Sequence, residues 1–218
     1  KYLQFMGMLT MITIGSIVLG WVAVSWFSVH NIEEPKYTVV QKASQYEIRQ
    51  YDGYIVAETV VQNIDNQRDA AGKGFRILAD YIFGDNTTAV SLDMTRPVLV
   101  SAKSSEKMNM TAPVLIKSNK KQGHYIVAFV MPKKYTIDTL PKPNNKKVKI
   151  REVAPKKVAV STFSWTSNNK AFIANKLKLL KALDKDGVAV IGSGGVARYN
   201  PPWTIPFMLR NEVFVEVK

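Results

Sequence analysis

The sequence predicts an α+β fold: a distorted antiparallel β-barrel with two helices from a duplicated β-α-β-β unit, preceded by one N-terminal transmembrane helix. Two observations lead to this prediction. The chain opens on a long uncharged apolar run, and the remainder contains an internal repeat at an offset of 102 residues. In both copies of the repeat, a strand-like segment precedes a helical pattern and further strand-like segments.

The opening run carries no charged residue from Phe5 to Phe27. As a helix it would be roughly 35 Å long, which is enough to cross the ~30 Å hydrocarbon core of a bilayer. Trp21 and Trp26 lie near its C-terminal end, as in the aromatic belt of a membrane interface. A cleaved signal peptide is the alternative, but its apolar core is usually shorter and ends in a small-residue cleavage site. We therefore predict an uncleaved anchor.

This interpretation divides the chain into an anchor, residues 1–31, and a domain, residues 32–218. The lipid bilayer is then the partner of residues 5–27. Lys1 precedes the apolar run and three cations, the first being Lys36, follow it, so the count of positive flanking charges leaves the orientation open. We expect the domain on the periplasmic or another extracytoplasmic side.

The repeat aligns residues 48–61 with residues 150–163 without gaps, and both segments are apolar over strand length. Helical patterns follow over residues 68–83 and 170–183, and each stops at a glycine. Further strands are expected at residues 96–102, 112–117, 124–131, 188–191 and 212–217. Each unit would bury one helix against half of an antiparallel sheet, and two units can close into a barrel with two outer helices.

Composition excludes several classes of protein. The chain has no cysteine, so disulfides, thiolate metal sites and cysteine nucleophiles are absent. It has two histidines and neither a Ser-His-Asp set nor a histidine pair at zinc spacing, so we predict that it is not an enzyme. The net charge of +13 suits an anionic partner or a solvated surface. No DNA-reading helix or aromatic RNA motif accompanies the charge, so we expect no nucleic-acid partner.

A glycine-rich stretch at residues 192–197 imitates the dinucleotide-binding fingerprint G-x-G-x-x-A. That fingerprint requires a helix to follow, because the helix N-terminus holds the pyrophosphate. Here Pro201 and Pro202 follow instead, and they forbid the helix. We interpret the stretch as a turn.

Four stretches carry a family resemblance: EPKY and YEIRQY within residues 34–51, MTAPV at 110–114, FVMPKKY, LPKP and VKIRE within 129–152, and YNPPWT, PF and RNEV within 199–213. Together they make the chain, from about Glu34 to Lys218, similar to the SOUL heme-binding protein family. The family's usual ending resembles Y-x-P-P-W-T-P-P-F-x-R-R-N-E-V, whereas this chain has Ile205 and Leu209 in place of a proline and an arginine. Losing that arginine weakens the loop as a carboxylate site.

The resemblance implies a distorted β-barrel with two helices from a duplicated unit, which agrees with the repeat. It also implies reversible, non-covalent binding of heme or another tetrapyrrole in a hydrophobic cleft beside the first helix, with no reaction firmly attached. One wall of the cleft would come from that helix, a second from the proline-rich loop, and cations would meet the propionates. The implied residues are Phe75, Leu78, Ala79 and Ile82 for the first wall, Trp203, Phe207 and Met208 for the second, and Lys73, Arg76 and Arg210 for the propionates.

Alternatives stay open at this point. The helix residues have the spacing of core residues, so they could simply pack the helix on the sheet. His124 is the candidate iron ligand, or else an exposed residue of a lysine-rich hairpin. The favoured function is a membrane-anchored heme carrier or buffer. The alternative is an accessory or structural subunit of a larger membrane complex that does not use heme, docked through Ser16 and Gly20 of the anchor.

Overall fold

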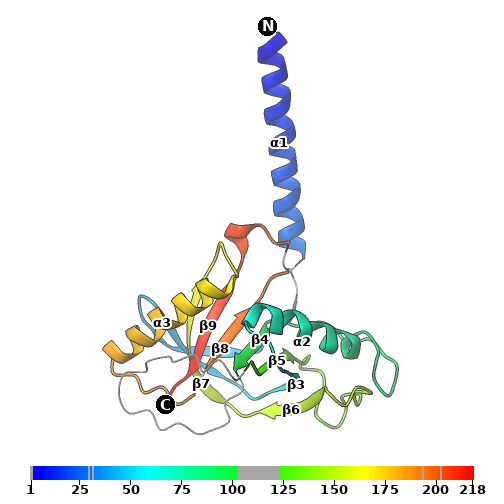
Figure 1. Cartoon of the computed structure of the whole chain (residues 1–218), viewed down its shortest axis with the longest axis vertical. Helices are drawn as coiled ribbons and strands as arrows, with labels where there is room; N and C mark the ends of the chain where they lie inside the picture. The colour runs from blue at the N-terminus through cyan, green and yellow to red at the C-terminus, as the bar shows by residue number, and fades with distance from the viewer. Residues whose placement is uncertain (1, 29, 31, 103–122, 193, 202) are drawn as a thin grey trace.

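The computed structural model describes the chain except residues 1, 29, 31, 103–122, 193 and 202. Helix α1 (Tyr2–Phe27) is a rod that stands away from the remainder of the chain (Figure 1). Among the described residues it is the one helix that is long and apolar enough to cross a membrane, by length and composition. Its surface is exposed from Thr10 to Gly20, so the described part of the chain leaves these apolar side chains largely uncovered. The expected N-terminal apolar helix is thus present.

In the described part of the chain, nine antiparallel strands form a single curled sheet, a half-barrel, in the order β1-β2-β7-β9-β8-β4-β5-β3-β6. The strands are β1 (Tyr37–Lys42), β2 (Glu47–Tyr51), β3 (Tyr54–Val61), β4 (Val98–Ala102), β5 (Tyr125–Val130), β6 (Lys149–Val153), β7 (Lys156–Phe163), β8 (Gly195–Arg198) and β9 (Asn211–Glu216). Helices α2 (Gln67–Ile82) and α3 (Asn169–Lys185) and the 3-10 turn η1 (Pro206–Met208) complete the fold. The mixed α+β class is confirmed, and the predicted barrel is an open half-barrel.

The duplication is visible in the element order, since β2-β3-α2-β4-β5 is followed by β6-β7-α3-β8-β9. The first three elements of the two halves begin 102 residues apart, as the alignment predicts. The halves interlock in the sheet, because β2 pairs with β7 and β6 pairs with β3.

One predicted strand is wrong. Residues 188–191 form only an isolated bridge between Val190 and Val217, and β8 begins later, within the glycine-rich stretch. The reason is close backbone approach. A Cβ atom at Gly194 would lie 2.1 Å from the carbonyl oxygen of Phe214, and one at Gly195 would lie 2.5 Å from that of Val100. Only glycine lets β8 enter between β4 and β9 here. The strand expected at residues 112–117 lies outside the described residues.

Helices α2 and α3 pack on the same sheet face and bury its largest apolar cluster. Each helix begins at an asparagine cap, Asn66 or Asn168, whose side-chain oxygen accepts backbone N–H groups of the first turn. Helix α2 lies close to the sheet at Gly74, where a Cβ atom would meet Val127 Cβ at 2.4 Å. This face of the sheet is therefore closed by packing.

Candidate functional site: the concave face of the sheet

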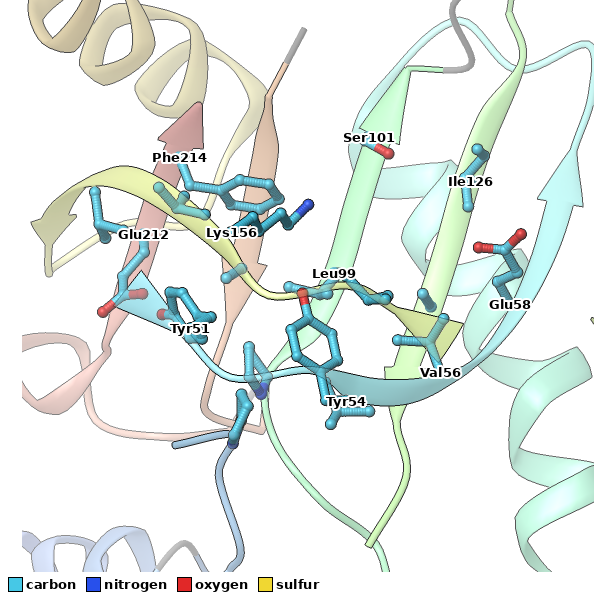
Figure 2. A pocket seen from close by; sticks show the side chains of 18 of the residues that line it. Tyr51, Tyr54, Val56, Glu58, Leu99, Ser101, Ile126, Lys156, Glu212 and Phe214 are labelled. Atoms are coloured by element: carbon cyan, nitrogen blue, oxygen red, sulfur yellow. The ribbon is translucent and has the colours of Figure 1, made fainter. Parts of the chain in front are cut away.

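A cavity lies on the sheet face opposite the two helices. Along β3, Ala57 and Val61 point into the helix-covered core, whereas the alternate residues Tyr54, Val56 and Glu58 line the cavity. The neighbouring strands alternate in the same way, because successive side chains of a strand point to opposite faces. Figure 2 shows side chains of the two halves facing each other across this space.

The cavity has a volume of about 140 Å³ and opens to solvent. This is below the ~300–1,000 Å³ typical of small-molecule sites, so a ligand of ordinary size would extend beyond the cavity over the rim. The apolar lining consists of Pro35, Val56, Pro97, Leu99, Ile126, Ala128, Val130, Val153, Val158, Val160, Ala197 and Phe214. Three tyrosines, Tyr51, Tyr54 and Tyr199, add amphipathic surface. The lining suits a largely apolar molecule.

One end of the cavity holds a buried charge cluster around Glu212, which is 1% exposed. Its carboxylate accepts hydrogen bonds from Arg49 Nη1 at 3.0 Å, Arg210 Nη2 at 2.9 Å and the Tyr199 hydroxyl at 2.7 Å. Arg210 also pairs with Glu34 at 3.0 Å and lies 3.7 Å from the centroid of the Tyr199 ring. Because the carboxylate is fully paired, it holds β2 and β9 together rather than offering a free charge to a ligand.

The cavity tyrosines stay neutral over the ordinary pH range. Burial, and next the neighbouring Tyr51, raise the pKa of Tyr54 to about 12. Burial also raises the pKa of Tyr199, and the adjacent Glu212 raises it further. A phenol whose pKa is raised is a poor source of phenolate, so neither side chain is prepared to ligate a metal as an anion.

Two cations stand at the rim. Arg151 Nη2 lies 2.9 Å from Glu58 Oε2, and the Arg151 side chain is 52% exposed. Lys156 Nζ lies 3.4 Å from Glu216 Oε2. Ion pairs that are open to solvent contribute at most about 1 kcal/mol, so an incoming carboxylate can compete for either cation.

The predicted wall on the first helix lies on the other face of the sheet. Leu78 and Ile82 are 0% and 1% exposed in the core between α2 and the sheet, and Ala79 is also buried. Phe75 is partly exposed, with its ring 5.2 Å from that of Phe129. Lys73 and Arg76 are exposed on α2. Core packing accounts for the spacing of the apolar residues, because a packed stripe and a ligand wall repeat with the same period.

The proline-rich loop, predicted as the second wall of the site, does not lie against the residues predicted on α2. Trp203 and Phe207 are exposed and Met208 is half-buried, in a loop that contacts the end of α1. The Ile205 N–H donates to Ser25 Oγ at 3.0 Å in this contact. Of the predicted propionate partners, Arg210 comes nearest to the cavity, through Glu212.

His124 precedes β5, is half-buried, and lines neither the cavity above nor a second, more polar one bounded by Glu33, Lys36 and Asp52. Within the described ranges, no group of three His, Asp or Glu residues is arranged to hold a metal ion. Whether His124 ligates iron remains a prediction.

Sequence reasoning missed the concave lining, although a signal for it exists. Strand β5 reads YIVAFV and most of β3 is equally apolar, so neither strand alternates as a half-exposed strand should. Helices cover only one face of these strands. The second apolar face therefore indicates a surface shaped for something other than water.

Comparisons with known proteins fit this architecture. The C-terminal domain of EcmrR has a TM-score of 0.56 at 10% identity, covering 80% of this chain and 97% of that one. An uncharacterized conserved protein from Listeria innocua reaches 0.54 at 10% identity, covering 80% and 92%, and a hydrolase from the same organism reaches 0.52 at 9%, covering 82% and 94%. At such identities the likeness shows the fold alone.

No curated protein matches the chain significantly. The sequence profile described as SOUL heme-binding protein matches residues 32–107 and 100–216, which is most of the chain beyond α1. The half-barrel, its two helices and these matches agree, and the chain belongs to the SOUL heme-binding protein family.

Proposed function

We propose that this protein is a membrane-anchored carrier or buffer for heme or another tetrapyrrole, with its ligand seated on the concave face of the sheet. Helix α1 would serve as the anchor, and the domain would lie on the extracytoplasmic side. Family membership supports the ligand class. The observation that carries the location is the apolar cavity on the uncovered sheet face, with cations at its rim.

The residues present fit such a ligand. A tetrapyrrole is a flat apolar disc with carboxylates at one edge, so it needs apolar walls and nearby cations. Leu99, Val158 and Phe214 would provide walls, and Lys156 and Arg151 would exchange their present partners for the carboxylates. Bound heme would supply its own redox and gas-binding chemistry, while the protein shields the disc and holds its edge.

Among the described residues that line the cavity there is no histidine, and the raised pKa values of Tyr54 and Tyr199 oppose phenolate ligation. Binding would therefore depend on burial of the disc and on its carboxylates, with little contribution from the iron. Without a strong axial ligand the complex should exchange readily, which suits a carrier or buffer better than a redox protein.

The test is a titration of the full chain in detergent with hemin and, separately, with iron-free protoporphyrin IX, followed by absorbance and fluorescence. We expect both to saturate with similar affinity. Phe214→Ala should weaken both about tenfold, since loss of one aromatic contact is worth about 1–1.5 kcal/mol. Phe75→Ala is the matched control on the helix-covered face and should leave both unchanged.

Other outcomes discriminate between the alternatives. Weakening by Phe75→Ala but not by Phe214→Ala would move the site to the first helix, where the resemblance places it. Much tighter binding of hemin than of protoporphyrin would show an iron ligand, and His124→Ala would then be the next variant. If neither compound binds, the heme proposal fails and the accessory-subunit alternative gains weight.

A further inference from the structure

A second surface is not explained by tetrapyrrole binding. The chain has four tryptophans: Trp21 and Trp26 lie on α1, Trp203 lies in the loop that contacts α1, and Trp165 lies in a loop that contacts Phe207 of that same loop. Trp165 is 70% exposed and Trp203 58% exposed, and Phe207 beside them is also exposed. Large aromatic side chains gathered on one exposed surface usually mark a binding face.

The loops hold this exposure in place. Trp165 lies in the loop between β7 and α3 with φ +72°, a backbone conformation that is unfavourable for a bulky residue. Its N–H donates to the carbonyl oxygen of Pro206 at 2.9 Å, and its ring lies 6.2 Å from that of Phe207. The two loops are thus joined. Trp165 stays exposed to solvent although its backbone conformation is strained.

The loop that carries Trp203 and Phe207 is attached to α1. Trp21 Nε1 donates to the carbonyl oxygen of Trp203 at 2.8 Å, and the fully buried Ser25 hydroxyl accepts the N–H of Ile205 at 3.0 Å. Figure 1 shows η1 and the β7–α3 loop at the base of the helix. The aromatic surface therefore lies beside the point where α1 leaves the domain.

We propose that Trp21, Trp26, Trp165, Trp203 and Phe207 form an aromatic platform that seats the domain on the headgroup region of a lipid bilayer. The occupant is lipid because α1 enters the bilayer through this face. A helix of 26 residues is about 39 Å long, and a ~30 Å hydrocarbon core leaves about 9 Å of it for the interface. Tryptophan is the residue enriched at that depth. The proposal rests on the anchoring proposed above and is independent of heme.

The chain has no cysteine, so single cysteines can be labelled without background. We would attach an environment-sensitive fluorophore at Thr166→Cys, next to Trp165, and at Glu152→Cys as the control. Glu152 is exposed on β6, at the end of the domain away from α1 (Figure 1). The labelled full chain is placed in phosphatidylcholine vesicles, with insertion checked by flotation in carbonate. Emission is then measured with headgroup-level spin-labelled lipid and with aqueous iodide.

If the platform lies on the bilayer, the label at residue 166 loses most of its emission to the spin-labelled lipid and resists iodide, whereas the label at residue 152 does the reverse. The double variant Trp165→Ser/Phe207→Ser should abolish lipid quenching at residue 166. Phe83→Ser, which removes a similarly exposed aromatic from the end of α2, should not.

The failures are distinct. An inserted chain whose labels at residues 166 and 152 respond alike overturns the platform and leaves the anchor standing. A chain that does not float with the vesicles overturns anchor and platform together. The hemin titration is read separately, so its failure bears only on the tetrapyrrole proposal.

Discussion

The two faces of the sheet are both apolar, yet they differ in how they are covered. On one face, α2 and α3 close over the strands, and Leu78 and Leu183 are completely buried. On the other face, Val158 and Leu99 line an open cavity whose buried charges are already paired. The first face is a core that stabilises the fold. The second is a preformed surface of similar composition, and the proposed tetrapyrrole binding requires that it stay uncovered.

The largest expected change in stability comes from the buried charge cluster around Glu212. A large loss there would show that the concave face also stabilises the fold. In Glu212→Gln, Arg49 and Arg210 lose their buried partner, so we expect unfolding to become about 3–5 kcal/mol easier. Urea denaturation in detergent, followed by circular dichroism, measures it. Glu58→Gln, which breaks the exposed pair with Arg151, should cost under about 1 kcal/mol. Equal costs would contradict the difference between the two clusters.

A pair of leucines compares the faces directly. Leu78→Ala should destabilise the protein by about 3 kcal/mol, because it leaves a cavity in a closed core, and should leave tetrapyrrole affinity unchanged. Leu99→Ala, on the cavity side of β4, should cost about 1 kcal/mol and weaken tetrapyrrole binding severalfold. Denaturation and ligand titration on both variants give the answer. The comparison breaks down if both variants change stability and affinity alike.

Two glycines on α2 compare the side of the helix that is packed against the sheet with its open side. Gly74→Ala should cost about 2 kcal/mol, since its new Cβ atom would overlap Val127 and push the helix off the sheet. At Gly72 nothing lies within 4 Å of the added atom, so Gly72→Ala should stabilise the protein by up to about 1 kcal/mol. The midpoints of thermal unfolding of both variants measure these changes. If Gly74→Ala stabilised the protein, the helix would be loosely packed on the sheet.

The smallest effect concerns pH. The unfolded chain releases the Tyr54 proton near pH 10, whereas the folded protein keeps it until about pH 12. Between these values the unfolded state binds fewer protons, so stability falls as pH rises. At pH 11 this loss is about 1.4 kcal/mol. Tyr54→Phe should remove it, which the pH dependence of urea midpoints would show as a shallower decline. An unchanged decline would mean that Tyr54 is accessible to solvent.

Sequence patterns predicted the local elements well, because strand alternation, helix periodicity and terminal glycines are short-range signals. The offset of 102 residues placed β6, β7 and α3 from β2, β3 and α2. It failed for β8, because Gly194 and Gly195 read as a turn until Phe214 and Val100 are known to lie against them.

The candidate site was harder to predict, since its lining comes from strands scattered over the whole domain. Glu212 was visible within the motif RNEV, but its pairing with Arg49 depends on β2 and β9 both flanking β7. The residues expected to form a wall on α2 lie on the helix-covered face and not in this cavity, and their part in ligand binding stays a prediction. Leu78 and Ile82 show that a 3.6-residue period identifies a buried stripe without saying what buries it.

The interlocked pairing of β2 with β7 and β3 with β6 has a consequence for how the chain is made. Ile48 of β2 pairs with Ala159 of β7, so one edge of β2 has no partner in the sheet until β7 has been synthesised. While the first half emerges, β2 lacks its partner β7 and one edge of β3 lacks β6. Such distant pairing makes folding slow. The interval leaves apolar strand edges open to other chains. An early helix fixed in a bilayer would keep nascent copies apart while the second half arrives.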